Sequence, residues 1–263
     1  MCRFLAYRGE PIFLSDLVCA ASHSLVRQSL FAEEGKTGTN GDGFGLSWYG
    51  ERPQAALYRE AGPAWSDENL QALCHHIRSR LFFAHIRAST GASTTRANCH
   101  PFAHDNWLFM HNGQVGGYPQ IKRDMEAMIP DRLYGSRIGS SDSEAIFLAA
   151  LANGLSNDPI AAMVRTLRAV HGLMIDAGIA APLRFTAAVT DGQTVFGLRW
   201  ASDNRPPSLY YRETSANLVL ASEPVDGYKE NWREVPKSCS FVAKPGRPIS
   251  LKYLEDLEVK AAA

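Results

Sequence analysis

The residue with the clearest chemical potential is Cys2, because removal of Met1 would leave a chain that begins with a cysteine. Such a residue carries a thiol nucleophile and a free α-amine on one atom framework. The reference pKa of an α-amine is about 8 and that of a cysteine thiol is about 8.5, so the amine can act as a base near neutral pH. Activation of a weak nucleophile by its own terminal amine is a known form of catalysis. Many ordinary chains also have a small second residue, so the prediction depends on residues further along.

Four later segments combine polar side chains with turn residues or strand ends. In chain order they are Asn40-Gly41-Asp42-Gly43, His85-Ile86-Arg87 with Thr90, His111-Asn112-Gly113, and Ser141-Asp142-Ser143-Glu144. The first segment has the plain interpretation of a hairpin turn. Its functional interpretation is a glycine backbone that another group can approach closely.

The other three segments also have two interpretations each. Arg87 ends an apolar strand, where it is either an ion-pair partner or a clamp whose planar guanidinium holds a carboxylate by two bonds. Asn112 and Gly113 are typical of a hairpin turn, but they could also donate amide N–H groups to a developing oxyanion. Asp142 lies in a capping-box pattern and could instead bind the ammonium group of a ligand. The residues alone leave both interpretations open.

The elements that must position these groups follow from hydrophobic patterning and turn signals. Strands are predicted at 3–8, 44–49, 54–59, 81–87, 107–111, 185–189, 194–200, 208–212, 217–221, 235–242 and 249–254. Helices are predicted at 66–76, 118–128, 140–151 and 159–170, and residues 11–31 are expected to be helical or rich in turns. Strands, then helices, then more strands indicate an α+β fold with mostly antiparallel sheet.

Composition excludes some classes of partner. The chain has 27 Lys and Arg against 27 Asp and Glu, so its formal net charge is zero. This balance gives no basis for an electrostatic search for nucleic acid or an anionic membrane. No apolar run approaches the length of a membrane span, and we expect no signal peptide.

Cysteine usage and length indicate the compartment and the domain organisation. The 5 cysteines have no framework spacing, which is typical of reduced thiols in a cytoplasm. No linker or repeat divides the 263 residues. We therefore expect one domain over 2–263 once Met1 is removed, with a frayed tail from about residue 256.

Taken together, Cys2 and the four segments resemble the glutaminase domain of class II glutamine amidotransferases, which are N-terminal-nucleophile hydrolases. The resemblance covers residues 2–155. Residues 218–224 and Trp232 extend it to the stand-alone members, which include the γ-glutamyl hydrolase of ergothioneine biosynthesis. The fold that it implies is a four-layer αββα sandwich, in which two antiparallel sheets pack face to face between helices.

The resemblance also implies a role for each matching residue. Cys2 would be the nucleophile with its amine as the general base, and Asn112 and Gly113 would form the oxyanion hole. The substrate-binding residues that it implies are Arg87 with Thr90 for the α-carboxylate of glutamine, Asp142 for the α-ammonium, and Asn40 with Gly41 beside the Cys2 amine. His85 and His100 are expected to support these groups without contacting the substrate.

The implied reaction is hydrolysis of the γ-amide of glutamine through a glutamyl thioester, with release of ammonia and without a cofactor or metal. A separate ammonia-acceptor enzyme would then be a partner, because fused amidotransferases carry a second, synthase domain. Sugar-synthesising members have a His just after the Arg-x-x-Thr element, where this chain has Gly91. The shape of the glutamine pocket is therefore expected to differ from theirs.

Other functions remain open at this point. The substrate could be a γ-glutamyl conjugate, hydrolysed without ammonia transfer. A metal-binding protein is an alternative of another class, although its candidate ligands lack CxxC or HExxH spacing; they are His85, Cys99, His100, His104 and His111. The set of site residues argues against an inactive scaffold. Bile-salt and penicillin hydrolases also begin with Cys, but they do not need the Asn-Gly and Ser-Asp-Ser-Glu elements.

Overall fold

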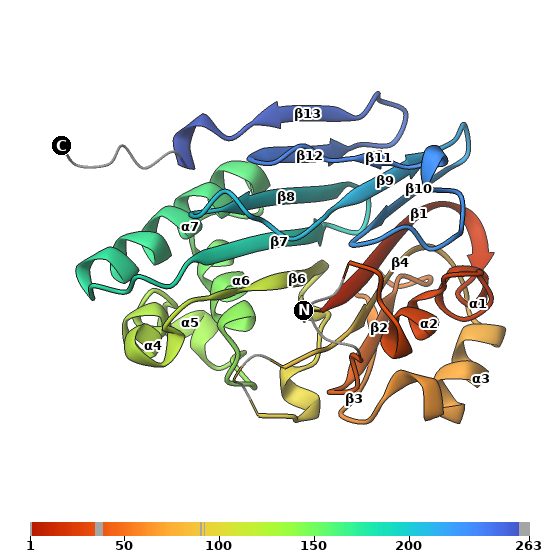
Figure 1. Ribbon diagram of the computed structural model, residues 1–263, viewed down its shortest axis with the longest axis horizontal. Helices are drawn as coiled ribbons and strands as arrows, with labels where there is room; N and C mark the ends of the chain where they lie inside the picture. Colours follow the sequence, from red (N-terminus) through yellow and green to blue (C-terminus); the bar gives the residue numbers. More distant parts are fainter. Residues whose placement is uncertain (1, 35–38, 90, 92, 258–263) are drawn as a thin grey trace.

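The computed structural model describes residues 2–34, 39–89, 91 and 93–257, and these residues form two antiparallel sheets (Figure 1). The strands of sheet A are β1 (Arg3–Phe13), β2 (Phe44–Trp48), β3 (Ala56–Glu60), β4 (Arg78–Ile86), β9 (Tyr210–Glu213), β10 (Asn217–Ala221) and β11 (Arg233–Glu234). Their order across the sheet is β11-β9-β10-β1-β4-β2-β3. The strand that follows Cys2 is therefore central, between β10 and β4.

Sheet B contains the strand that carries the Asn-Gly pair. Its strands are β5 (Phe102–His104), β6 (Trp107–Val115), β7 (Leu183–Thr190), β8 (Val195–Ala201), β12 (Cys239–Ala243) and β13 (Ser250–Tyr253). Their order is β13-β12-β8-β7-β6-β5.

Helices cover the outer face of each sheet. The α-helices are α1 (Ser15–Val18), α2 (Leu25–Leu30), α3 (Glu68–His76), α4 (Tyr118–Ala127), α5 (Asp131–Tyr134), α6 (Asp142–Ala152) and α7 (Pro159–Asp176), and the short 3₁₀ turns are η1 (Ala64–Ser66), η2 (Arg96–Asn98), η3 (Lys229–Asn231) and η4 (Glu255–Leu257). Apolar side chains of α1–α3 pack on sheet A, and those of α4–α7 pack on sheet B (Figure 1). This arrangement confirms the predicted α+β class and its αββα layers. None of the helices in the described ranges has the length and apolar character that a bilayer crossing requires.

The two-residue period of a strand decides which side chains enter the gap between the sheets. On β1, Phe4 lies in the apolar layer between the sheets, whereas Leu5 packs against the helices. On β6, Met110 lies in that layer and Phe109 packs against the helices. Alternation therefore directs Cys2 and Asn112 toward the gap, from opposite sheets.

The plain interpretation of Asn112-Gly113 as a turn is wrong. Both residues lie inside β6 and pair with β7, Asn112 opposite Thr186 and Gly113 opposite Phe185. Gly113 has φ +150°, and a Cβ there would lie 1.9 Å from the carbonyl oxygen of Arg184. Glycine is needed for close packing of β6 on β7, and the local turn signal is overridden by the ladder.

Three predicted boundaries also differ from the structure. β1 does not end at Gly9 but continues to Phe13, because its pairing with β4 resumes beyond a register shift between Arg8 and Ile12. Only 15–18 and 25–30 of the segment 11–31 are helical. The strand predicted at 235–242 begins only at Cys239, because residues 235–238 connect β11 in sheet A to β12 in sheet B.

Candidate active site

Cys2 lies at the end of sheet A, immediately before β1. Its half-buried thiol donates a hydrogen bond to the carbonyl oxygen of Ala88, with 3.5 Å between the sulfur and oxygen atoms. Burial raises the pKa of the thiol, although the positive charges of Arg87 and Arg3 act in the opposite direction. The thiol is therefore protonated near neutral pH and needs a base in order to attack.

Arg87 follows β4, and the glycine-rich segment holds its side chain. Arg87 is 4% exposed, and its guanidinium donates to the carbonyl oxygen of Asp42 and to Ser89 Oγ, each at 3.2 Å. Asp42 Oδ2 accepts the backbone N–H of Ser89 at 2.7 Å. Sequence reasoning missed the roles of Asp42 and Ser89, because 45 residues separate Asp42 from Arg87. Thr90, the predicted companion of Arg87, lies outside the described residues.

Asn40 and Gly41 begin the same segment but contact other elements. The Asn40 backbone N–H donates to Ser29 at 2.8 Å and its side-chain amide donates to Gln28 at 3.3 Å. A Cβ on Gly41 would lie 2.9 Å from the Trp65 ring. The contacts of these residues tie the segment to α2 and η1, and their predicted place beside the Cys2 amine stays a prediction.

Asn112 is fully buried, and neither its side-chain nitrogen nor its oxygen has a hydrogen-bond partner among the described residues. Such unpaired buried groups are uncommon and cost roughly 1–3 kcal/mol each. A polar side chain without partners, directed toward the gap that Cys2 faces, suits a group that binds a ligand oxygen.

Asp142 is the first residue of α6, and it does not cap the helix. Ser141 is the N-cap, and its hydroxyl accepts the backbone N–H of Glu144 at 3.3 Å. Asp142 instead accepts the backbone N–H groups of Val115 at 2.9 Å and Ser143 at 2.8 Å. The cap and the carboxylate are separate residues, so Asp142 is held at the end of β6 with its charge available to a ligand.

Three buried histidines lie beside these groups. His111 Nδ1 is 2.8 Å from Ser143 Oγ, and His85 Nε2 is 3.3 Å from the carbonyl oxygen of His111, which links β4 to β6. The rings of His85 and His100 stack with their centroids 4.2 Å apart. Burial lowers the pKa of His85 to about 3 and holds that of His100 well below its usual range. Both rings are neutral at physiological pH.

A cavity of about 360 Å³ brings five of the predicted residues together. Of those residues, Cys2, Arg87, His100, Gly113 and Asp142 line it. Asn112, His85, Asn40 and Gly41 do not belong to its lining.

Asn98, which sequence reasoning did not single out, also lines this cavity. Its amide donates to Ser140 Oγ at 3.2 Å and accepts the Ser140 backbone N–H at 2.7 Å, which fixes the segment before α6. The only signal in the sequence was its position directly before Cys99 and His100.

The metal-binding alternative finds no support in this geometry. Within the described ranges, no group of three or more His, Cys, Asp or Glu side chains is arranged to hold a metal ion. His85 and His100 meet face to face rather than converging on a point.

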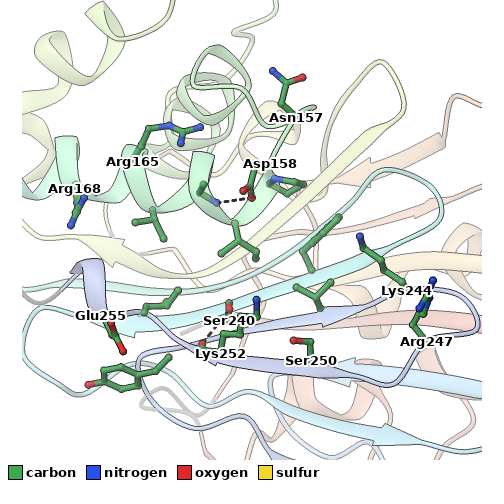
Figure 2. A pocket seen from close by; sticks show the side chains of 18 of the residues that line it. Asn157, Asp158, Arg165, Arg168, Ser240, Lys244, Arg247, Ser250, Lys252 and Glu255 are labelled. Atoms are coloured by element: carbon green, nitrogen blue, oxygen red, sulfur yellow. Dashed lines mark hydrogen bonds between the residues drawn. The ribbon is translucent and has the colours of Figure 1, made fainter.

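A wider groove of about 890 Å³ lies between α7 and the strands β12 and β13 (Figure 2). Asp158 caps α7 by accepting the backbone N–H of Ala161 at 3.1 Å. The basic residues that line this groove are Arg165, Arg168, Lys244, Arg247 and Lys252. These lining residues, all within the described ranges, include no cysteine or histidine, so the smaller cavity is the candidate active site.

The chain is similar to known proteins over most of its length. Residues 14–205 match the family model of class-II glutamine amidotransferases. The probable glutamine amidotransferase DUG3 of Saccharomyces cerevisiae is 32% identical over 93% of this chain and 82% of its own length. A γ-glutamyl-hercynylcysteine sulfoxide hydrolase of Mycolicibacterium smegmatis is 27% identical over 90% of this chain and 92% of its own length. A solved glutamine aminotransferase class-II domain protein of Silicibacter pomeroyi has a TM-score of 0.77 and 36% identity, covering 96% of this chain and 99% of that one.

The buried histidines predict a loss of stability in acid. Their folded-state pKa values lie below the unfolded value of about 6.5, so the unfolded chain takes up protons that the folded rings exclude. The stability that comes from these neutral rings is fully present above about pH 6.5 and is lost as the pH falls toward the folded-state pKa of each ring. For His85 that pKa is about 3. Each such ring contributes a slope of about 1.4 kcal/mol per pH unit within its window.

Urea denaturation at about pH 7 and about pH 5 measures this slope. We expect His100→Gln to reduce the pH dependence of the unfolding free energy relative to wild type. Equal slopes in the two proteins would show that the His100 ring binds protons in the folded chain as it does in the unfolded chain, which would contradict its lowered pKa.

Proposed function

We propose that this chain, which belongs to the class-II glutamine amidotransferases, hydrolyses the γ-amide of glutamine or of a γ-glutamyl compound with Cys2 as its nucleophile. The observation that carries the proposal is one shared cavity, lined by the Cys2 thiol, the Arg87 guanidinium and the Asp142 carboxylate. A free amino acid end presents one carboxylate and one ammonium, so these charges match it. Residues 2–263 would act as one type-2 domain after removal of Met1.

In this proposal the clamp fixes the substrate and leaves its γ-carbonyl to react. Arg87, with Thr90, holds the α-carboxylate, and Asp142 holds the α-ammonium. Fixing both groups places the γ-carbon against the Cys2 sulfur and converts a bimolecular attack into an effectively unimolecular one.

The chemistry proceeds through a thioester. The Cys2 amine takes the thiol proton as the sulfur attacks the γ-carbonyl carbon, which forms a C–S bond and places negative charge on the oxygen. The amine then gives that proton to the leaving nitrogen as the C–N bond breaks and ammonia departs. Water, deprotonated by the same amine, attacks the thioester, which releases glutamate and restores the thiol.

Asn112 and Gly113 would stabilise the oxyanion. The unpaired Asn112 amide provides a buried donor on the strand that faces Cys2. Loss of one such donor costs about 3–4 kcal/mol of transition-state stabilisation in related acyl-transfer chemistry. The Asn40-Gly41 backbone would orient the Cys2 amine, and the neutral rings of His85 and His100 would support the site.

The γ-glutamyl relative favours a second candidate function within the same chemistry. The Mycolicibacterium smegmatis protein is a γ-glutamyl-hercynylcysteine sulfoxide hydrolase, so the leaving group here could be a larger amine than ammonia. The glutamyl end would be bound by the same residues. If ammonia is the product to be used, a separate acceptor enzyme would be the partner.

The test is glutamate release from L-glutamine and from a panel of γ-glutamyl conjugates by chain whose intact mass shows whether Met1 is gone. We expect release that disappears in Cys2→Ala. Release from glutamine would favour the amidotransferase, and release from a conjugate alone would favour the hydrolase. Release that survives Cys2→Ala would contradict the proposal.

The Asp142 clamp predicts a specific effect on substrate binding. Asp142→Asn removes the charge that pairs with the α-ammonium, and a charge-assisted hydrogen bond contributes about 1.5–3 kcal/mol. KM should therefore rise by about 10- to 100-fold. Asp158→Asn is the matched control, because Asp158 also lies at a helix N-terminus but does not line the cavity. An equal KM in Asp142→Asn and wild type would remove Asp142 from the clamp.

A further inference from the structure

A buried ion pair joins the first residues of the chain to the segment that follows β10. Arg3 Nε donates to Glu223 Oε2 at 2.9 Å, and the two side chains are 0% and 1% exposed. Arg3 Nη1 also donates to the carbonyl oxygen of Cys2 at 2.9 Å. One guanidinium therefore connects the Glu223 carboxylate to the main chain of Cys2.

The Glu223 carboxylate has three further partners. Its oxygens accept the backbone N–H groups of Glu33 at 2.9 Å and Glu34 at 3.2 Å. His23 Nε2 lies 2.6 Å from Oε1. Glu223 thus fixes three parts of the chain at one point: the start of β1, the turn before α2, and the residues that follow α2.

Ser222, the residue before Glu223, holds the main chain of Phe4, which follows Arg3. Its hydroxyl accepts the backbone N–H of Phe4 at 3.1 Å, and its own N–H donates to the Phe4 carbonyl at 2.9 Å. Phe4 is thus held by the Ser222 main chain and hydroxyl, whereas the Cys2 carbonyl is held by the Arg3 side chain. The orientation of that side chain depends on Glu223.

Electrostatics keeps this carboxylate ionised. Burial alone would raise its pKa, but the hydrogen bonds from His23 and the backbone of Glu33 and Glu34, together with the charge of Arg3, lower the pKa of Glu223 to about 2. The hydrogen bond between His23 and Glu223 also raises the pKa of His23. A neutral residue at position 223 would leave the buried Arg3 without its counter-charge.

We propose that Glu223 is a positioning residue for Cys2, acting through Arg3 to fix the main chain from which both the thiol and the α-amine project. The inference rests on the function proposed above. Neither Arg3 nor Glu223 lines the cavity, and both are already engaged, Arg3 by Glu223 and the Cys2 carbonyl oxygen, and Glu223 by Arg3 and backbone N–H groups, so we assign neither to binding of the glutamyl group. Their contribution is geometric, and a displacement of about 1 Å at a reacting atom can cost on the order of 100-fold in rate.

Glu223→Gln tests this through the separation of kcat from KM. We expect kcat to fall by roughly 10- to 100-fold, with KM unchanged because Arg87 and Asp142 are untouched. Asp226→Asn is the matched control, since this acid lies on the same segment but pairs with Arg212 and Trp232 instead. The control should retain the kcat and KM of wild type.

Arg3→Lys is the second variant. It keeps the positive charge for Glu223 but loses the planar fork that reaches two acceptors at once. It should fold, because the buried carboxylate retains a cation, and it should lower kcat in the same way. This variant carries the test if Glu223→Gln does not fold.

The rate of Cys2 alkylation by iodoacetamide, followed by peptide mass spectrometry, needs no substrate. We expect slower alkylation in Glu223→Gln and Arg3→Lys, and the wild-type rate in Asp226→Asn. If wild type hydrolyses nothing but these rates differ as expected, the positioning role stands and the proposed function fails. Folded variants with wild-type kcat and alkylation rate, or with a raised KM alone, would overturn the positioning role.

Discussion

The face-to-face packing of sheets A and B is the constraint on which the rest of the structure depends. Phe4 and Phe83 of sheet A meet Leu108 and Met110 of sheet B in one buried apolar layer. Burial of this layer fixes the register of every strand that contributes to it, because a slip by one residue would exchange the side chains that face the other sheet for those that pack under the helices. The same register directs Cys2 into the gap, so the packing that stabilises the fold also aims the nucleophile.

The end of the gap near Cys2 is polar, and it departs from what stability alone would favour. His100 and Asn112 each bury two polar side-chain atoms without a hydrogen-bond partner in the described residues, and His85 buries one. Apolar residues of similar size would avoid roughly 1–3 kcal/mol for each such atom. Groups that violate local rules in this way are expected at functional sites, where a ligand supplies the missing partners. The buried Arg3–Glu223 ion pair is a second feature that stability alone does not explain. We assign it the role of orienting the main chain of Cys2.

Local pattern was sufficient for most of the strand–helix order, and it placed Arg87 at the end of a strand and Asp142 at the start of a helix, because each of those elements has a clear period. It failed at Asn112-Gly113, where the turn signal is local and the competing β7 ladder lies more than 70 residues later. It also missed the Asp42 support of Arg87 and the link from Arg3 to Glu223, which spans 220 residues. Such contacts arise only when strands distant in sequence become neighbours, and no single window of sequence contains both partners.

We propose Cys2 as the nucleophile of a glutamyl-binding cavity. The most direct measurement is covalent labelling with a glutamine analogue whose γ-amide is replaced by a diazoketone, which alkylates the group that attacks the γ-carbon. We expect one label on the peptide that begins with Cys2, and protection of that peptide by L-glutamine or a γ-glutamyl compound. A label on another residue, or labelling that these compounds do not slow, would contradict the proposal.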